Sequence, residues 1–151
     1  MKIHVNKKIK TPVNIKSIKK NFTLRFKVFI SKKIHKDFEK LSGDNSPIHS
    51  NIEFCKKNGY KKKLGYGFLI NCILSQIYGK FFPGGNELCL SQTGIYKSPF
   101  FIGDTLTIVL KVEHKSVENQ IINLSTIFFR KNNIKVFHGN GVLKLSLNKS
   151  K

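Results

Sequence analysis

Residues 66–82 read YGFLINCILSQIYGKFF, the most continuously apolar stretch of the chain. On a helix these side chains are apolar on almost every side, and a helix of that kind is buried by the rest of its protein. The chain has 151 residues and is 40% hydrophobic, which is enough for one domain with one core. We therefore expect a domain built around a buried helix at this stretch.

Strand-like runs lie on both sides of this helix in the sequence. Residues 21–30, NFTLRFKVFI, alternate apolar and polar side chains, which is the period of a half-buried strand. A sheet with one apolar face must cover something, and only the helix at 66–82 is apolar enough. The predicted fold class is α+β, an antiparallel sheet wrapped around a long central helix. The later runs, separated by turn residues, are ELCLSQTGIYKS (87–98), DTLTIVLKVEHK (104–115), QIINLSTIFFRK (120–131) and IKVFHGNGVLKLSL (134–147).

Two short helices are expected between the first strand and the central helix. The segment SKKIHKDFEKLSG begins with Ser31, a plausible N-cap, and ends with Gly43, a helix stop. A second helix begins near Ser50, with Ser50 or Asn51 as its cap. The stretch LSGDNSPIHS at residues 41–50 is then a loop between the two helices.

The start of the chain, MKIHVNKKIKTPVNIKSIKK, is basic and has no apolar core of the kind found in a signal peptide. We expect residues 1–20 to be a loosely held arm and residues 21–151 to form the single domain. The chain has no run of about eighteen apolar residues, so we expect no membrane span. These features predict a cytoplasmic protein.

The cysteines number three: Cys55, Cys72 and Cys89. Two of them lie in strongly apolar surroundings, and no close pair suggests a metal site. We expect them to be reduced and structural, and we expect no bound metal.

The formal net charge is +20, yet Arg25 and Arg130 are the only arginines among 28 basic residues, and alanine is absent. This composition is typical of an AT-rich genome, so much of the basicity reflects codon usage. Nucleic-acid binders draw on arginine for bidentate contacts, and the lysines here are spread along the chain. Binding to nucleic acid is therefore disfavoured, and the charge favours another anionic partner, such as nucleotide phosphates or an acidic carrier protein.

Asp44, one of three aspartates, and His49, one of five histidines, lie in the stretch at residues 41–50. Taken alone, GDNSPIHS would more often be a polar turn, since Asp, Asn, Ser and Pro are standard turn residues. The alternative is a catalytic pair held by the restricted backbone at Pro47. His4, His35 and His114 lie in no such pattern.

Further matches along the chain favour the catalytic interpretation. SGDNSPIH resembles the S-G/E-D-x-N-P-x-H hallmark of MaoC-like dehydratases and (R)-specific enoyl-thioester hydratases at Asp44, Pro47 and His49. YGFL resembles the family's H-G-M-L, and the helix ends in YGKFFPGG where the family has a Gly and then a Pro-Gly. SQTGIYKSPFFIGDTL resembles its S/G-Q-x-x-x-F-K-x-P-V-x-x-G-D-T-L. The ordered series covers roughly residues 26–147 and implies the hot-dog fold.

The resemblance implies reversible hydration of trans-2-enoyl thioesters, which is also dehydration of (R)-3-hydroxyacyl thioesters. Asp44 and His49 are then expected to hold and activate one water, and the backbone N–H of Gly67 to meet the thioester oxyanion. No cofactor is expected, because coenzyme A or the phosphopantetheine of an acyl carrier protein carries the substrate. The resemblance also implies a homodimer with the thioester arm entering at the subunit interface.

Two further sets of residues are expected to support the site: a stripe on the central helix and two positions that differ from the resembled family. Gly67, Asn71 and Ser75 lie at i, i+4 and i+8 and form one narrow polar or small stripe, and Ser75 aligns with a helix serine of the family. Ser46 replaces the family's Asn, and Tyr66 replaces its His at the helix start. Both departures bear on rate and substrate more than on reaction class.

Three other functions stay open at this point. The first is a catalytically idle hot-dog module that binds an acyl thioester or a partner protein. The second is a thioesterase, which is disfavoured because it would not need Asp44 and His49 at this spacing. The third is a nucleic-acid binder.

Overall fold

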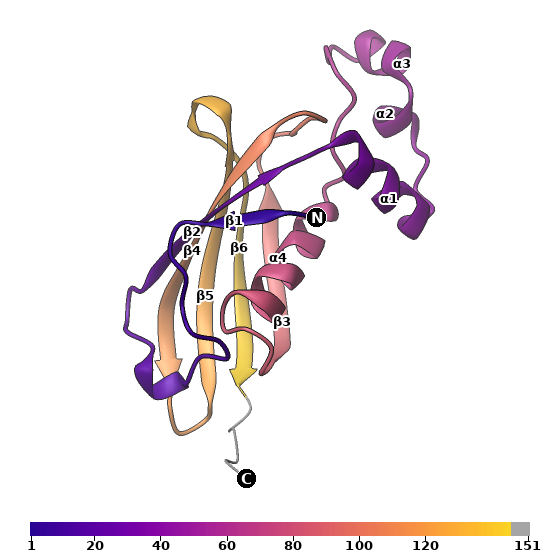
Figure 1. The fold of residues 1–151 in the computed structure, drawn as a ribbon. Coiled ribbons are helices and arrows are strands. Elements are labelled where there is room, and N and C mark those ends of the chain that lie inside the picture. The colour runs from indigo at the N-terminus through magenta and orange to yellow at the C-terminus, as the bar shows by residue number, and fades with distance from the viewer. Residues whose placement is uncertain (146–151) are drawn as a thin grey trace.

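Six strands form one antiparallel sheet in the computed structural model, which describes residues 1–145 (Figure 1). Their order across the sheet is β1-β2-β4-β5-β6-β3, and every neighbouring pair is antiparallel. The predicted sheet is therefore confirmed, with a short additional strand at the N-terminus. The strands are β1 (Ile3–Val5), β2 (Thr23–Phe29), β3 (Glu87–Tyr96), β4 (Thr105–Ser116), β5 (Ile121–Arg130) and β6 (Ile134–Leu145).

Alternation along the strands places one apolar face of the sheet against the core. In β2 the side chains of Leu24, Phe26 and Val28 are buried and those between them are exposed. The predicted periods of β4 and β5 are confirmed in the same way, because every second side chain is buried. The buried set comprises Leu106, Ile108, Leu110, Val112, Ile122, Leu124, Thr126 and Phe128.

The sheet curls around the helix α4 (Leu69–Lys80), as expected of a hot-dog fold (Figure 1). The expectation that α4 is buried on every side is wrong. Phe68, Cys72, Ser75 and Gly79 share one exposed stripe at i, i+4, i+7 and i+11. The physical reason is that one curved sheet covers only one side of a helix, so the apolar composition exceeds what a single chain can bury.

Three short helices extend beyond one end of the sheet (Figure 1): α1 (Lys32–Ser42), α2 (Pro47–Ser50) and α3 (Ile52–Lys57). The predicted caps are confirmed, since the hydroxyl of Ser31 accepts from the Ile34 N–H at 3.2 Å and Gly43 ends α1 with φ 71°. The expected loop at residues 41–50 is only partly a loop. Pro47 fits the first turn of a helix and starts α2, which places His49 on a helical turn.

The N-terminal residues pack onto the domain. β1 pairs with β2, and the side chains of Ile3, Ile15 and Ile18 are buried in the core. The expectation of a loosely held arm at 1–20 is therefore wrong, because the apolar residues among the lysines cover one end of the core. The predicted strand at 134–147 and the predicted domain at 21–151 both extend beyond the described residues, which end at 145.

The expectation of three structural cysteines holds only for Cys55. Its buried thiol donates to the carbonyl oxygen of Ile48 at 3.0 Å. Cys72 and Cys89 are exposed, since the first lies on the open stripe of α4 and the second on the edge strand β3. All three are free thiols.

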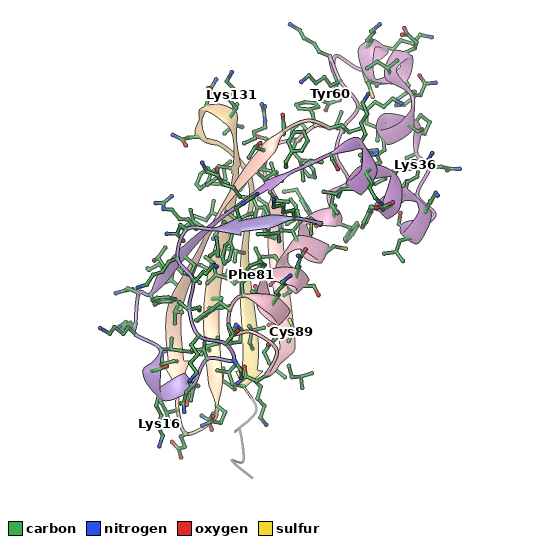
Figure 2. The ribbon with its side chains drawn as sticks, in the orientation of Figure 1. Lys16, Lys36, Tyr60, Phe81, Cys89 and Lys131 are labelled. Atoms are coloured by element: carbon green, nitrogen blue, oxygen red, sulfur yellow. The ribbon has the colours of Figure 1, made fainter. Side chains whose placement is uncertain are left out.

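Basic side chains reach solvent at separate ends of the molecule. Figure 2 shows Lys16, Lys36 and Lys131 pointing outward from three distant parts of the ribbon. This spread does not favour a groove that tracks a nucleic-acid backbone. Within residues 1–145, no helix is both long and apolar enough to cross a membrane.

The burial of Ile18 leads to a test of the N-terminal segment. Ile18→Ala removes buried methyl groups and should lower the free energy of unfolding by about 2 to 5 kcal/mol. The neighbouring exposed side chain provides the control, so Lys19→Ala should change it by less than about 0.5 kcal/mol. The measurement is urea denaturation followed by circular dichroism. Equal stability of the two variants would mean that this segment does not cover the core.

Candidate active site

The Asp44 carboxylate is held by its own loop. Its Oδ1 accepts from the Ser46 hydroxyl at 2.5 Å and from the Ser46 N–H at 3.0 Å. These two bonds, with a smaller contribution from nearby His49, hold the pKa of Asp44 below its usual value, because they favour the charged form. The side chain is 41% exposed. Asp44 is therefore ionised at neutral pH, and Oδ2 is the carboxylate oxygen that lies toward His49.

The His49 ring is oriented by a backbone carbonyl. Its Nδ1 lies 3.0 Å from the carbonyl oxygen of Leu64. A carbonyl oxygen can only accept, so Nδ1 carries the hydrogen and the neutral ring has its lone pair at Nε2. Nε2 lies 3.9 Å from Oδ2 of Asp44. This separation is too long for a direct hydrogen bond and suits one water molecule that contacts both atoms.

Two further residues contact this pair, Tyr66 and His35, and sequence reasoning missed their part in it. The Tyr66 hydroxyl donates to the backbone oxygen of Asp44 at 2.8 Å, and its ring centroid lies 4.1 Å from that of His49. His35 is buried, its Nε2 lies 3.2 Å from the same Leu64 oxygen, and burial lowers its pKa. The sequence signal was the aromatic residue at position 66, where the resembled family has a different side chain.

Gly67 lies two residues before the first residue of α4 and directly follows Tyr66. No backbone acceptor for its N–H is found within residues 1–145, so the N–H is available at the positive end of the helix dipole. Gly67 lines a cavity of about 250 Å³ whose wall also includes Tyr96 and Lys97. A Cβ atom at Gly67 would lie 3.3 Å from the Tyr96 ring, so glycine lets the backbone approach this ring closely.

Asn71 and Ser75 lie in a different place from the pair. They line a second cavity of about 330 Å³ between α4 and β3, together with Tyr78 and Gln92. The Tyr78 hydroxyl donates to the Gln92 side-chain oxygen at 2.9 Å across this cavity. The structure thus brings Asp44, Ser46 and His49 together. Gly67 lines one separate cavity, and Asn71 and Ser75 line another.

No group of three or more His, Cys, Asp or Glu side chains that could hold a metal ion is found among the residues that the structure describes. Asp44 and His49 supply two side chains of this kind, one fewer than such a group requires. Their arrangement is suited to acid–base chemistry on a water molecule.

Known proteins are similar to this chain in sequence and in fold. No family model matches the chain. An (R)-specific enoyl-CoA hydratase from Aeromonas caviae is 28% identical over 108 residues, which are 72% of this chain and 81% of the relative. A mitochondrial 3-hydroxyacyl-[acyl-carrier-protein] dehydratase from Arabidopsis thaliana is 31% identical over 109 residues, 71% of this chain and 64% of the relative.

Solved structures give the same result. The (R)-hydratase from A. caviae involved in PHA biosynthesis superposes with a TM-score of 0.81 at 25% identity, covering 86% of this chain and 98% of that one. The unliganded R-hydratase PhaJ1 from Pseudomonas aeruginosa has a TM-score of 0.82 at 19% identity, covering 95% and 88%. The solved structures show the hot-dog fold, and the sequence relatives together with the motif order show that the chain belongs to the MaoC-like family of (R)-specific hydratases and dehydratases.

Proposed function

We propose that the protein catalyses the reversible hydration of trans-2-enoyl thioesters to (R)-3-hydroxyacyl thioesters. The observation that carries this proposal is the 3.9 Å gap between Asp44 Oδ2 and His49 Nε2. The other polar atoms of both groups are already occupied, Oδ1 by Ser46 and Nδ1 by Leu64. Two free acceptors therefore face one water-sized position, which is the arrangement that water activation needs.

In the hydration direction, the water oxygen bonds to C3 of the enoyl thioester while His49 Nε2 takes one of its protons. Asp44 Oδ2 accepts a hydrogen bond from the other O–H, whose hydrogen stays on the product hydroxyl, and stabilises the imidazolium that forms. The proton then passes from Nε2 to C2 on the same face, and the imidazole is neutral again. The elements of one water are thus added across the double bond, and dehydration follows the same path in reverse.

Negative charge develops on the thioester oxygen as C3 is attacked. The Gly67 N–H is the proposed donor to that oxygen, since helix N-termini present free donors and a favourable dipole. Because water supplies both the hydroxyl group and the proton, the reaction needs no bound cofactor. Coenzyme A or the phosphopantetheine of an acyl carrier protein carries the acyl group.

Mutation of the pair tests this function directly. Asp44→Asn keeps the shape of the side chain and removes its charge, and His49→Ala removes the base. Each should lower turnover of short trans-2-enoyl-CoA by about a hundredfold to ten-thousandfold. The double variant should be barely worse than the worse single variant, because both groups act on one water. The measurement is loss of enoyl absorbance.

Circular dichroism is the control for folding of these variants. Wild-type turnover by both single variants would show that the pair is only a polar turn. If the native protein is stabilised against heat by coenzyme A yet turns over no enoyl thioester, it is an idle binding module.

Three consecutive lysines directly precede Leu64, whose carbonyl oxygen orients His49. Lys61 and Lys62 are exposed, Lys63 is partly exposed, and the next residue is Leu64. We propose that they attract the phosphates of coenzyme A or an acidic carrier protein.

Reversal of these charges should separate binding from chemistry. The triple variant K61E/K62E/K63E should raise KM severalfold at low salt and flatten its salt dependence, with little change in kcat. The matched control reverses three exposed lysines at the far end of the molecule, K16E/K19E/K20E, and should leave KM unchanged. Equal KM values at low salt for both triple variants would assign Lys61, Lys62 and Lys63 to ordinary solvated surface.

The proposed assembly is a homodimer in which β3 lies against β3 of a second copy. β3 is the last strand in the sheet order, so one of its edges is free within residues 1–145. Leu88, Leu90 and Ile95 on this strand are exposed, and so is Phe68 at the start of α4. An edge strand with exposed apolar side chains is a ready site for pairing with another chain. The second copy would also cover the open stripe of α4.

The dimer is tested by charge insertion on β3. Wild-type protein should have about twice the monomer mass of 17.3 kDa in multi-angle light scattering at micromolar concentration. Ile95→Asp, at a side chain that is 56% exposed, should give the monomer mass. The control Leu41→Asp changes another exposed apolar residue, on α1, and should stay dimeric. A monomeric wild type contradicts the proposed assembly.

A further inference from the structure

We propose that Tyr66 is the positioning residue that sets the relative placement of Asp44 and His49. Its hydroxyl donates to the Asp44 backbone oxygen at 2.8 Å, and its ring centroid lies 4.1 Å from the His49 ring. One side chain therefore contacts both members of the pair. The proposal rests on the proposed function for its effect on rate, and on geometry alone for its structural effect.

Tyr66 is itself firmly held. Its side chain is almost fully buried, and its ring also packs against His35 and Phe38 of α1, with centroids 4.6 and 5.0 Å away. The preceding residues are fixed by backbone bonds, since the Gly65 N–H donates to the Phe100 oxygen at 2.7 Å and the Leu64 N–H to the Ile48 oxygen at 3.2 Å. A rigidly held ring can restrict its neighbours, whereas a mobile one cannot.

The remaining constraint on His49 comes from the same segment. The Leu64 oxygen accepts from His49 Nδ1 at 3.0 Å, two residues before Tyr66. The Leu64 carbonyl thus fixes the rotation of the imidazole in its plane, and the Tyr66 ring limits its tilt. Within residues 1–145, the Tyr66 hydroxyl is the one hydrogen-bond partner of Asp44 from outside its own loop.

The phenol keeps its hydrogen over the whole working range of pH. Burial, followed by the charges of Glu39 and Asp44, raises the pKa of Tyr66 to about 12. It therefore donates to Asp44 whenever the enzyme is folded. Loss of the hydroxyl should lower the height of the pH–rate profile without moving its limbs.

Tyr66→Phe is the sharpest test because it keeps the ring and removes only the hydroxyl. We expect kcat on a short trans-2-enoyl-CoA to fall about tenfold with KM unchanged, since a displaced catalytic group lowers the chemical step. In the Asp44→Asn background the same change should have almost no further effect on kcat. A merely structural tyrosine would lower kcat by the same factor in both backgrounds.

The matched control is Tyr60→Phe, the same chemical change in the segment after α3, where Tyr60 lies toward the sheet (Figure 2). No hydrogen bond from the Tyr60 hydroxyl is found within residues 1–145, so this variant should keep wild-type kcat. Thermal unfolding confirms that both variants are folded.

A nuclear magnetic resonance measurement separates failure of this proposal from failure of the proposed function. In Tyr66→Phe, the carbonyl carbon of Asp44 and the ring signals of His49 should shift, whereas in Tyr60→Phe they should not. Unmoved signals in Tyr66→Phe overturn the positioning role, whatever the protein catalyses. Wild-type kcat in Tyr66→Phe, with an active wild type, overturns it as well and leaves the hydratase function standing.

Discussion

The burial of one face of α4 against the curved sheet is the constraint on which the other features depend. Ile70, Ile73 and Ile77 have no exposure, and they belong to the one core cluster that also contains buried side chains of β4, β5 and β6. Because the helix cannot shift, its N-terminus at Gly67 stays at one end of the sheet. Tyr66 and Leu64, shortly before it, are then fixed as well, and side chains of α1 and α2 contact them. The reactive pair is positioned through this chain of contacts.

Much of the fold was predictable because it depends on local patterns. The two-residue period of β2, β4 and β5, the capping Ser31 and the terminating Gly43 each act within a few residues of their own position. The cover on α4 was mispredicted, because composition shows what is apolar and not whether one chain has enough sheet to cover it. The N-terminal segment was mispredicted because Ile15 and Ile18 are isolated among polar residues in the sequence and form no recognisable pattern. In the folded chain both side chains are buried in the core.

In the candidate site, too, the local pattern was predictable and the contacts between distant residues were not. The motif identifies Asp44 and His49 as candidate catalytic residues. The atoms that orient them come from residues distant in the sequence. His49 is oriented by a backbone carbonyl fifteen positions away, and Asp44 by a hydroxyl twenty-two positions away. A carbonyl belongs to every residue, so no sequence pattern singles out Leu64. Ser46, by contrast, is close to Asp44 in the sequence. Its side chain is shorter than the asparagine of the resembled family and still donates to the Asp44 carboxylate.

The exposure of Asp44 links the proposed assembly to the proposed chemistry. In the single chain, the two hydrogen bonds from Ser46, with a smaller contribution from His49, hold the pKa of this carboxyl below its usual value, so Asp44 is a charged hydrogen-bond acceptor beside His49. Removing water from a carboxylate raises its pKa, and an acyl thioester bound over the pair would do so. A substrate or partner surface that excludes water would therefore strengthen the hydrogen bond that Asp44 accepts from the reacting water, while His49, held in the tautomer with its lone pair at Nε2, is the base that receives the proton.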